Sequence, residues 1–202
     1  MKKEKKIKIL IIIIISILII IVGIIFINKN YFNENISQEE LENFNTYFNL
    51  TENNGFLMSK YNNSDEIDIN EVFYTGGNIK ENLTDEEKKN FFDFLNVKEM
   101  HLPIIAISKQ NAENFFYKKT GEKLNNIEEK LNKWYYNEGS NKFCRVKGDT
   151  NYKEIQCSKG KKIDEKTYKI NYTINDNIEK KYGTVTLLVD NGFYLFKSND
   201  VY

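Results

Sequence analysis

The sequence predicts an α+β domain behind an N-terminal membrane anchor, with about four helices packed on a C-terminal antiparallel β-meander. Three observations carry this prediction: an uncharged aliphatic run over residues 9–27, helical periodicity in the first half of the remainder, and strand-like alternation in the second half. A run of helices followed by a run of strands is typical of helices packed on one antiparallel sheet.

The aliphatic run reads ILIIIIISILIIIVGIIFI and would span roughly 28 Å as a helix, close to the hydrocarbon thickness of a bilayer. Neither a small-residue cleavage site nor a lipid-attachment cysteine follows it, which favours an uncleaved span over a signal peptide. Five lysines precede the run and only Lys29 lies just beyond it, which predicts a cytoplasmic N-terminus. We therefore expect a cytoplasmic basic tail (1–8), a transmembrane helix (9–27), a linker (28–36) and one extracytoplasmic domain (37–202).

The first half of the predicted domain shows helix signals. Capping-box patterns, in which a hydroxyl residue is followed three positions later by glutamate, stand at residues 37–40 and 84–87. A third helix is expected after Ser108 and a fourth over residues 122–136, both with apolar side chains at helical spacing. Residues 51–83 show no regular pattern apart from a short apolar run. The apolar stripes of these helices indicate core packing.

The second half contains a strong hairpin signal, Asn191-Gly192 between two apolar runs. This two-residue loop pairs Leu187 with Phe196 on one face and Leu188 with Leu195 on the other. Because both faces are apolar, we expect the hairpin to be central in its sheet rather than at an exposed edge. Cystatin-like and NTF2-like folds, which contain curved sheets, also have helices followed by four to five strands. This analogy concerns only the order of the elements along the chain.

The two cysteines of the chain, Cys144 and Cys157, could face each other across a second hairpin. A turn about residues 150–151 would place them opposite one another, with Val146 and Ile155 on the same face. Directly opposed strand residues have Cα atoms about 4.5–5.5 Å apart, which a disulfide accepts. We expect a disulfide that stabilises the domain by roughly 3 kcal/mol, with two buried free thiols as the alternative.

Three stretches of the chain resemble a family of uncharacterised exported proteins: NNGFLMSKYNNSDEIDINEVFYTGGNI (53–79), NFFYKKTGEKLNNIEEKL (114–131) and GDTNY (148–152). Its members are membrane-anchored or lipoprotein-like and come from low-GC Gram-positive bacteria. The resemblance covers most of residues 40–160 and implies a bacterial, extracytoplasmic protein. It brings no assigned activity and no catalytic residue. Members carry a histidine shortly before GDTN, where this chain reads NEGSNKFCRVK, so any role of that histidine is absent here.

Composition and motifs argue against several function classes. The charge is balanced at 29 basic and 29 acidic residues, and outside the N-terminal tail it is slightly acidic, so no nucleic-acid footprint is expected. No nucleotide-binding or hydrolase motif is present, and no cofactor is expected. His101, the only histidine, stands in an apolar stretch and is predicted to be a packed structural residue. Because the chain has only one histidine and two cysteines, a zinc site would need mostly carboxylate ligands, which is unusual.

Two classes of function fit these observations, and the first is favoured. The first is a non-catalytic binding or assembly module at the cell envelope, anchored by one membrane span and contacting a protein or cell-envelope partner. Its expected partner surface consists of Leu188, Phe193 and Leu195 on the last hairpin. The alternative is a cell-envelope hydrolase that uses clustered carboxylates. These are Asp65, Glu66, Asp68 and Glu71, and a solvated acidic loop or a loose calcium site is the simpler explanation of this cluster.

Overall fold

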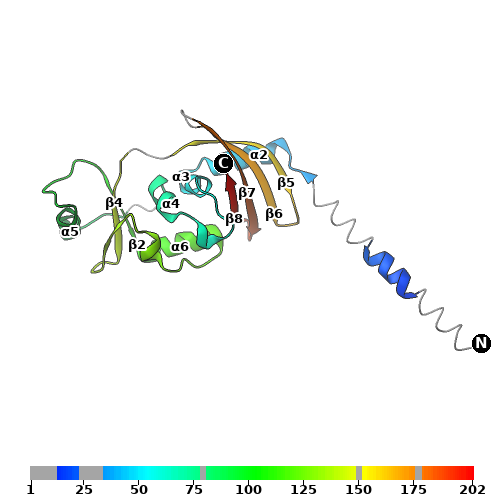
Figure 1. The fold of residues 1–202 in the computed structure, drawn as a ribbon, viewed down its shortest axis with the longest axis horizontal. Helices are drawn as coiled ribbons and strands as arrows, with labels where there is room; N and C mark the ends of the chain where they lie inside the picture. Colours follow the sequence, from blue (N-terminus) through cyan, green and yellow to red (C-terminus); the bar gives the residue numbers. More distant parts are fainter. Residues whose placement is uncertain (1–12, 23–33, 78–80, 149–151, 176–178) are drawn as a thin grey trace, which may run out of the picture.

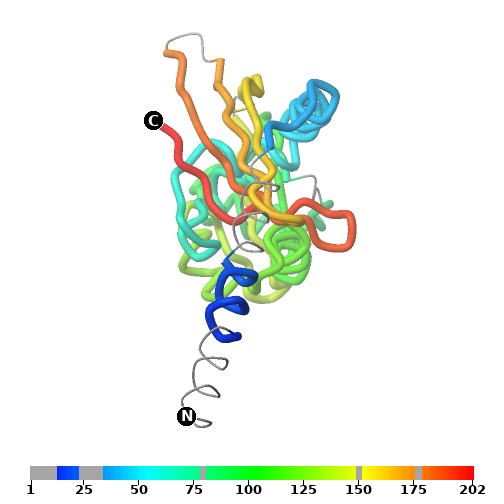
Figure 2. The backbone as a smooth tube through the Cα atoms, turned by 90° about the vertical axis from the view of Figure 1, so that its right-hand side faces the viewer, coloured from blue at the N-terminus to red at the C-terminus, as the bar shows by residue number. Residues whose placement is uncertain are grey.

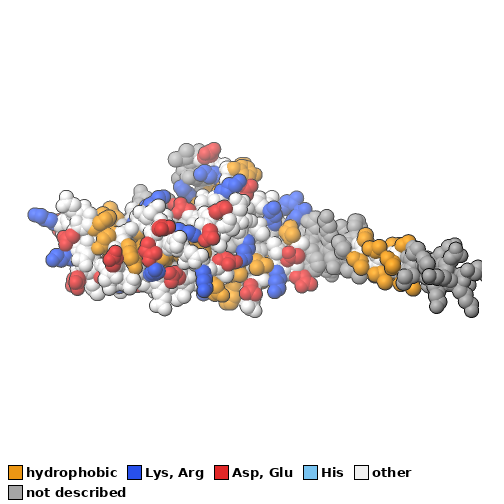
Figure 3. Space-filling view, turned by 60° about the horizontal axis from the view of Figure 1, so that its bottom comes forward, with side chains coloured by type: hydrophobic (Ala, Val, Ile, Leu, Met, Phe, Trp, Pro, Cys, Tyr) orange, Lys and Arg blue, Asp and Glu red, His pale blue; other side chains and the backbone are white. Residues whose placement is uncertain are grey.

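The computed structural model of the chain describes residues 13–22, 34–77, 81–148, 152–175 and 179–202 (Figure 1). Residues 13–22 are helical with exposed side chains, and Figure 3 shows mostly hydrophobic side chains along this segment. Within the described ranges no helix combines the length and the hydropathy that a bilayer crossing requires. The rest of the predicted span, the basic tail and most of the linker lie outside the described residues.

The strands form two antiparallel sheets, which confirms the α+β prediction and the C-terminal meander. The five-stranded sheet has the order β1-β5-β6-β7-β8, and the three-stranded sheet the order β2-β4-β3. The strands of the larger sheet are β1 (Glu34–Asn35), β5 (Glu154–Lys162), β6 (Thr167–Asn175), β7 (Lys180–Asp190) and β8 (Phe193–Val201). Those of the smaller sheet are β2 (Ile104–Ser108), β3 (Tyr135–Asn137) and β4 (Lys142–Val146).

The helices precede or interrupt these strands. They are α2 (Gln38–Phe48), α3 (Thr51–Asn54), α4 (Ile69–Thr75), α5 (Asp85–Leu95), α6 (Lys109–Thr120) and α7 (Ile127–Lys130), with 3₁₀ turns at Gly55–Leu57 and Ser64–Glu66. In Figure 1 the five-stranded sheet and α2 lie at one end of the domain, and the smaller sheet with α5 lies at the opposite end of its long axis.

The main core includes the space between α2 and the five-stranded sheet and continues under α4 and α6 to the three-stranded sheet. Figure 2 shows β6, β7 and β8, coloured orange to red, running side by side, and α2 packs beside β5. Phe44 and Phe48 project from one face of α2 and are buried. The Phe44 ring centroid lies 5.4 Å from that of Tyr168 and 4.9 Å from that of Tyr194. The helical stripe predicted from the sequence is therefore core.

Both predicted capping boxes are present. The Ser37 hydroxyl accepts a hydrogen bond from the Glu40 amide, and the Glu40 carboxylate accepts one from the Ser37 amide. Thr84 and Glu87 exchange the same pair of bonds at the start of α5. The third predicted helix is also confirmed as α6, which ends where Gly121 adopts a left-handed conformation.

The predicted disulfide hairpin is wrong, because its two strands belong to different sheets. Cys144 in β4 pairs with Ala106 of β2 and with Tyr135 of β3, whereas Cys157 in β5 pairs with Tyr172 of β6. Both thiols are free. The physical reason is that β3 and β4 are joined by a short turn and β2 takes the remaining edge, so β4 has no edge left for β5.

Two further expectations differ from the structure. Within residues 122–136, predicted as one helix, only α7 is α-helical, and Tyr135–Asn137 is a strand. Asn126 adopts a left-handed conformation at the start of α7, which separates this short helix from the chain before it. Residues 51–77, expected to be irregular, contain α3 and α4. His101, expected to be packed, has an 89% exposed side chain, because the loop after α5 lies on the surface.

The last hairpin has the predicted register, with Leu187 opposite Phe196 and Leu188 opposite Leu195. Its predicted central position is wrong, since β8 is the terminal strand of the sheet. Helices nevertheless pack against part of each face. Phe196 packs under the helices at the α2 side, where its ring stacks on Phe56 with centroids 4.6 Å apart. Leu195, on the opposite face, lies against the end of α6 and is 8% exposed.

Candidate functional site

The tip of the β7–β8 hairpin is the most distinctive surface feature of the described chain. Asn191 and Gly192 have φ values of 48° and 82°, as a two-residue type I′ turn requires. Directly after the turn, the Phe193 side chain is 57% exposed. Two grooves lie at this tip, and Phe193 lines both of them.

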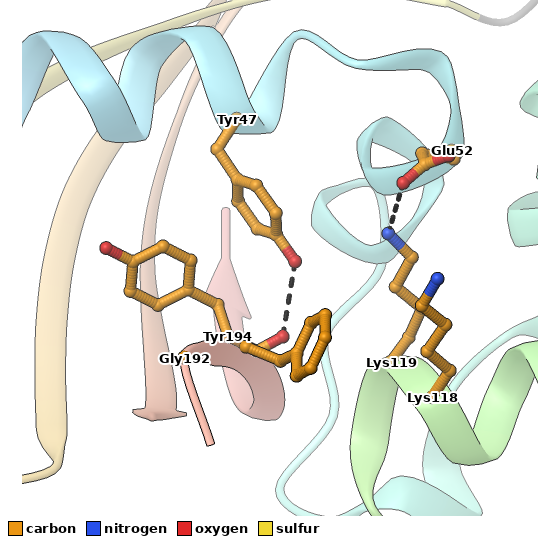
Figure 4. A pocket seen from close by; sticks show the side chains of 7 residues that line it. Tyr47, Glu52, Lys118, Lys119, Gly192 and Tyr194 are labelled. Atoms are coloured by element: carbon orange, nitrogen blue, oxygen red, sulfur yellow. Dashed lines mark hydrogen bonds and ion pairs between the residues drawn. The ribbon is translucent and has the colours of Figure 1, made fainter. Parts of the chain in front are cut away.

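The first groove, here called the polar groove, has a volume of about 290 Å³. It is lined by Tyr47, Glu52, Lys118, Lys119, Gly192, Phe193 and Tyr194 (Figure 4). Helix α2 supplies the tyrosine at its top, α3 the glutamate, α6 the two lysines, and the hairpin the remainder.

A partly buried ion pair between Lys119 and Glu52 lines the polar groove. Lys119 Nζ donates hydrogen bonds to Glu52 Oε1 at 2.5 Å and to Asn53 Oδ1 at 2.6 Å. The same ammonium group lies 5.7 Å from the Tyr47 ring centroid and 5.6 Å from the Phe115 centroid. Burial lowers the pKa of Lys119, while Glu52 acts in the opposite direction. Because its hydrogen bonds go to α3, Lys119 holds α6 to α3 and has a structural role.

The hydroxyl of Tyr47 ties α2 to the hairpin. It donates to the Tyr194 carbonyl oxygen at 3.2 Å, as Figure 4 shows. Burial and the nearby Glu52 carboxylate raise the pKa of Tyr47 well above its ordinary value, so the hydroxyl keeps its proton at neutral pH. This contact fixes the hairpin tip relative to the helices and presents Phe193 in a defined position.

The second groove, here called the apolar groove, has a volume of about 460 Å³. It is lined by Tyr117, Lys118, Gly121, Leu188, Asp190, Asn191, Phe193, Leu195 and Lys197. The structure thus brings together the three residues that the sequence proposed as a partner surface. It adds Tyr117 of α6, which is 58% exposed and which the sequence analysis missed. Its position gave a signal that could have identified it: Tyr117 directly follows the inward-facing Phe116, so on a helix its aromatic ring is expected at the surface.

The lysines at the grooves differ in their availability. Lys197 Nζ donates to the Thr120 carbonyl at 2.7 Å and lies 3.3 Å from Glu122 Oε1. Lys118 is exposed, lines both grooves and makes no ion pair with the described part of the chain. The site therefore combines two exposed aromatic rings and an aliphatic floor with several charged side chains, among them Lys118.

The predicted acidic cluster is not part of either groove. Asp68 accepts hydrogen bonds from the first amides of α4, and Glu71 accepts the Thr75 hydroxyl. Glu66 accepts the Asn62 amide at 2.8 Å, while Asp65 lies 3.2 Å from Lys130 Nζ. These carboxylates order their own loop and are not arranged as a catalytic pair. Among the described residues, no group of three potential metal ligands gathers.

The two cysteines are also not a reactive site. Burial raises the pKa of both the Cys144 and the Cys157 thiol to about 12. Both thiols are therefore protonated at neutral pH and act as small apolar side chains of the core.

The fold and the grooves together define an α+β module with two grooves at a hairpin tip. Comparison with known proteins adds one finding: residues 1–84 match the family model described as sigma factor regulator N-terminal. This model is typical of membrane anti-sigma factors. The match is consistent with a membrane-anchored chain, and it gives no support to the lipoprotein-like part of the resemblance seen in the sequence. No curated protein and no solved structure matches the chain.

Proposed function

We propose that this protein is a membrane-anchored, non-catalytic module of a system that regulates a sigma factor. The match of residues 1–84 to sigma factor regulators is the observation that carries the proposal. The matched stretch includes the aliphatic run 9–27, which serves as the anchor, with the lysines before it in the cytoplasm. It also includes α2, α3 and α4, which build one side of the folded domain.

In this topology the domain faces outward and has no direct access to a sigma factor in the cytoplasm. The domain therefore acts through a second protein that crosses or reaches the membrane. We place the contact with this partner at the hairpin tip. Exposed aromatic side chains beside an apolar groove are the features that dominate binding energy at protein interfaces, and Phe193 with Tyr117 supplies them.

A genetic experiment tests this function. The gene is deleted in its own host, and the activity of reporters for each sigma factor of that host is measured. We expect the deletion to change the output of at least one sigma factor several-fold, and the intact gene to restore it. If no reporter responds to the deletion, the proposed regulatory role is wrong.

Two matched variants test the site separately from the function. Phe193→Ser removes the exposed ring at the grooves, and Tyr182→Ser removes a 49% exposed ring elsewhere on the same sheet. Both are surface changes, which usually alter stability by less than about 0.5 kcal/mol. At equal protein abundance on immunoblots, Phe193→Ser should behave like the deletion and Tyr182→Ser like the intact gene. Full complementation by Phe193→Ser would refute the hairpin tip as the contact site, while the proposed regulatory function would still stand.

A further inference from the structure

The turn between β5 and β6 carries the densest run of lysines in the folded domain. Residues 159–169, here called the β5–β6 tip, read KGKKIDEKTYK and hold five lysines against Asp164 and Glu165. Asp164 is held within the turn, where its Oδ1 accepts the amides of Lys166 and Thr167 at 2.9 and 2.8 Å. At the end of the tip, the apolar side chain of Ile163 is 42% exposed. The lysines are Lys159, Lys161, Lys162, Lys166 and Lys169.

The chain enters the folded domain beside this tip. Strand β1 pairs antiparallel with β5, with Glu34 opposite Lys162 and Asn35 opposite Lys161. The Ile36 amide then donates to the Gly160 carbonyl at 3.0 Å. Because β1 runs from the tip toward the interior of the sheet, its first residue, Glu34, lies at the end of β5 that is nearest to Ile163.

Chain length then limits how far the tip can lie from the anchor. Six residues, 28–33, separate the end of the aliphatic run from Glu34. Even fully extended, they reach at most roughly 25 Å. The first several ångströms beyond the hydrocarbon are the headgroup layer, and electrostatic attraction extends about 8–10 Å further at physiological salt. The lysines of the tip are therefore tethered within reach of the lipid phosphates.

We infer that the β5–β6 tip docks on the membrane surface, with its lysines on anionic lipid headgroups and Ile163 at the boundary of the acyl region. This inference rests on the anchor that is part of the proposed function. A docked tip fixes the five-stranded sheet against the membrane and points the three-stranded sheet with α5 away from it, since these lie at opposite ends of the long axis (Figure 1). Each lysine near an anionic surface strengthens such an association about five-fold.

The test uses the full chain reconstituted into vesicles of phosphatidylcholine alone or mixed with phosphatidylglycerol. Ile163→Trp places a reporter at the tip, and Leu102→Trp places one at a 56% exposed position next to β2, at the far end. Quenching is measured with a lipid that carries a doxyl group close to its headgroup. The unsubstituted chain gives the contribution of Trp134, its only tryptophan.

We expect quenching of the tryptophan at position 163 in the anionic vesicles only, and none at position 102. Removing two lysines with Lys161→Gln and Lys162→Gln should lower the docked-to-undocked ratio about 25-fold. About 1 M salt should have the same effect without any substitution. Equal quenching in both lipids, or none at position 163, would overturn the docking. Carbonate extraction of the same vesicles tests the anchor separately. If carbonate removes the chain from the vesicles, both the anchor and the docking are refuted. If the chain resists extraction but shows no quenching, only the docking is refuted.

Discussion

Asparagine side chains from α2 and α3 close the outer edge of β5, and their removal should destabilise the domain in a graded way. Asn49 makes the largest contribution: its Nδ2 donates to the Ile155 carbonyl at 2.7 Å, and its Oδ1 accepts the Ile155 amide at 2.9 Å. Asn54 forms the same pair of bonds with Lys153. These side chains stand where a neighbouring strand would otherwise supply the hydrogen bonds of a sheet edge.

The size of the effect follows from the number of bonds that each asparagine makes. Besides the two bonds to Ile155, Asn49 accepts the Tyr152 hydroxyl at 3.1 Å and donates to the Asn45 carbonyl at 2.8 Å. At about 1 kcal/mol net for each bond, Asn49→Ala should cost about 2–4 kcal/mol. Asn49 has a right-handed helical backbone, so alanine introduces no strain that would add to this figure.

Two other asparagines of α2 provide internal controls. The Asn45 side chain accepts one bond from the β5 edge, from the Cys157 amide at 3.0 Å, so Asn45→Ala should cost about 1 kcal/mol. Asn43 is exposed on the same helix, and Asn43→Ala should be neutral or slightly stabilising because alanine favours helix.

The free energy of unfolding is measurable by urea titration of the full chain in a mild detergent, with Trp134 emission as the signal. Trp134 is 8% exposed and belongs to the main core, so its emission reports loss of that core. For a domain of this size, a loss of about 3 kcal/mol corresponds to a fall of about 6–12 °C in Tm. If Asn49→Ala proves as stable as Asn43→Ala, the β5 edge does not depend on these side chains and the reasoning is refuted.

Two further predictions concern pH and backbone packing. Burial would raise the pKa of Glu87, but the amide of its helix N-cap and the Lys142 ammonium at 3.1 Å hold that pKa at about 2, below its ordinary value of 4.5. This contribution of about 3 kcal/mol is complete above pH 4.5 and is lost as pH falls toward 2. Glu87→Gln should therefore flatten the acid unfolding curve, and an unchanged curve would contradict this prediction. Gly183→Ala would place a Cβ 2.2 Å from the Tyr172 ring and should lower the free energy of unfolding by about 2–3 kcal/mol, which thermal melts can measure. Gly139→Ala is the control and should be neutral, because its Cβ would meet nothing closer than 3.4 Å. Equal melting temperatures for the two variants would contradict the packing argument.

Features set by residues close together in the sequence were predictable. The capping boxes join positions three apart, and the β7–β8 register follows from a two-residue turn. Leu188, Phe193 and Leu195, which the sequence proposes as a partner surface, line one groove because the hairpin register places them together; their role in binding stays a prediction. The predicted pairing of Cys144 with Cys157 failed because it assumed that strands adjacent in sequence pair with each other, whereas β4 pairs on both sides within another sheet.

The sequence by itself determined the aliphatic run, the α+β order, the helix starts and the last hairpin, since each depends on local composition, spacing or turn chemistry. The tertiary structure decided which strands share a sheet, which edge Asn45, Asn49 and Asn54 close, and that Tyr117 of α6 lines a groove together with Phe193. The physical reason is sequence distance: Asn49 and Ile155 are 106 positions apart. Contacts of that range leave no periodic signal in the sequence, because they are selected by the packing of the whole domain rather than by local preference.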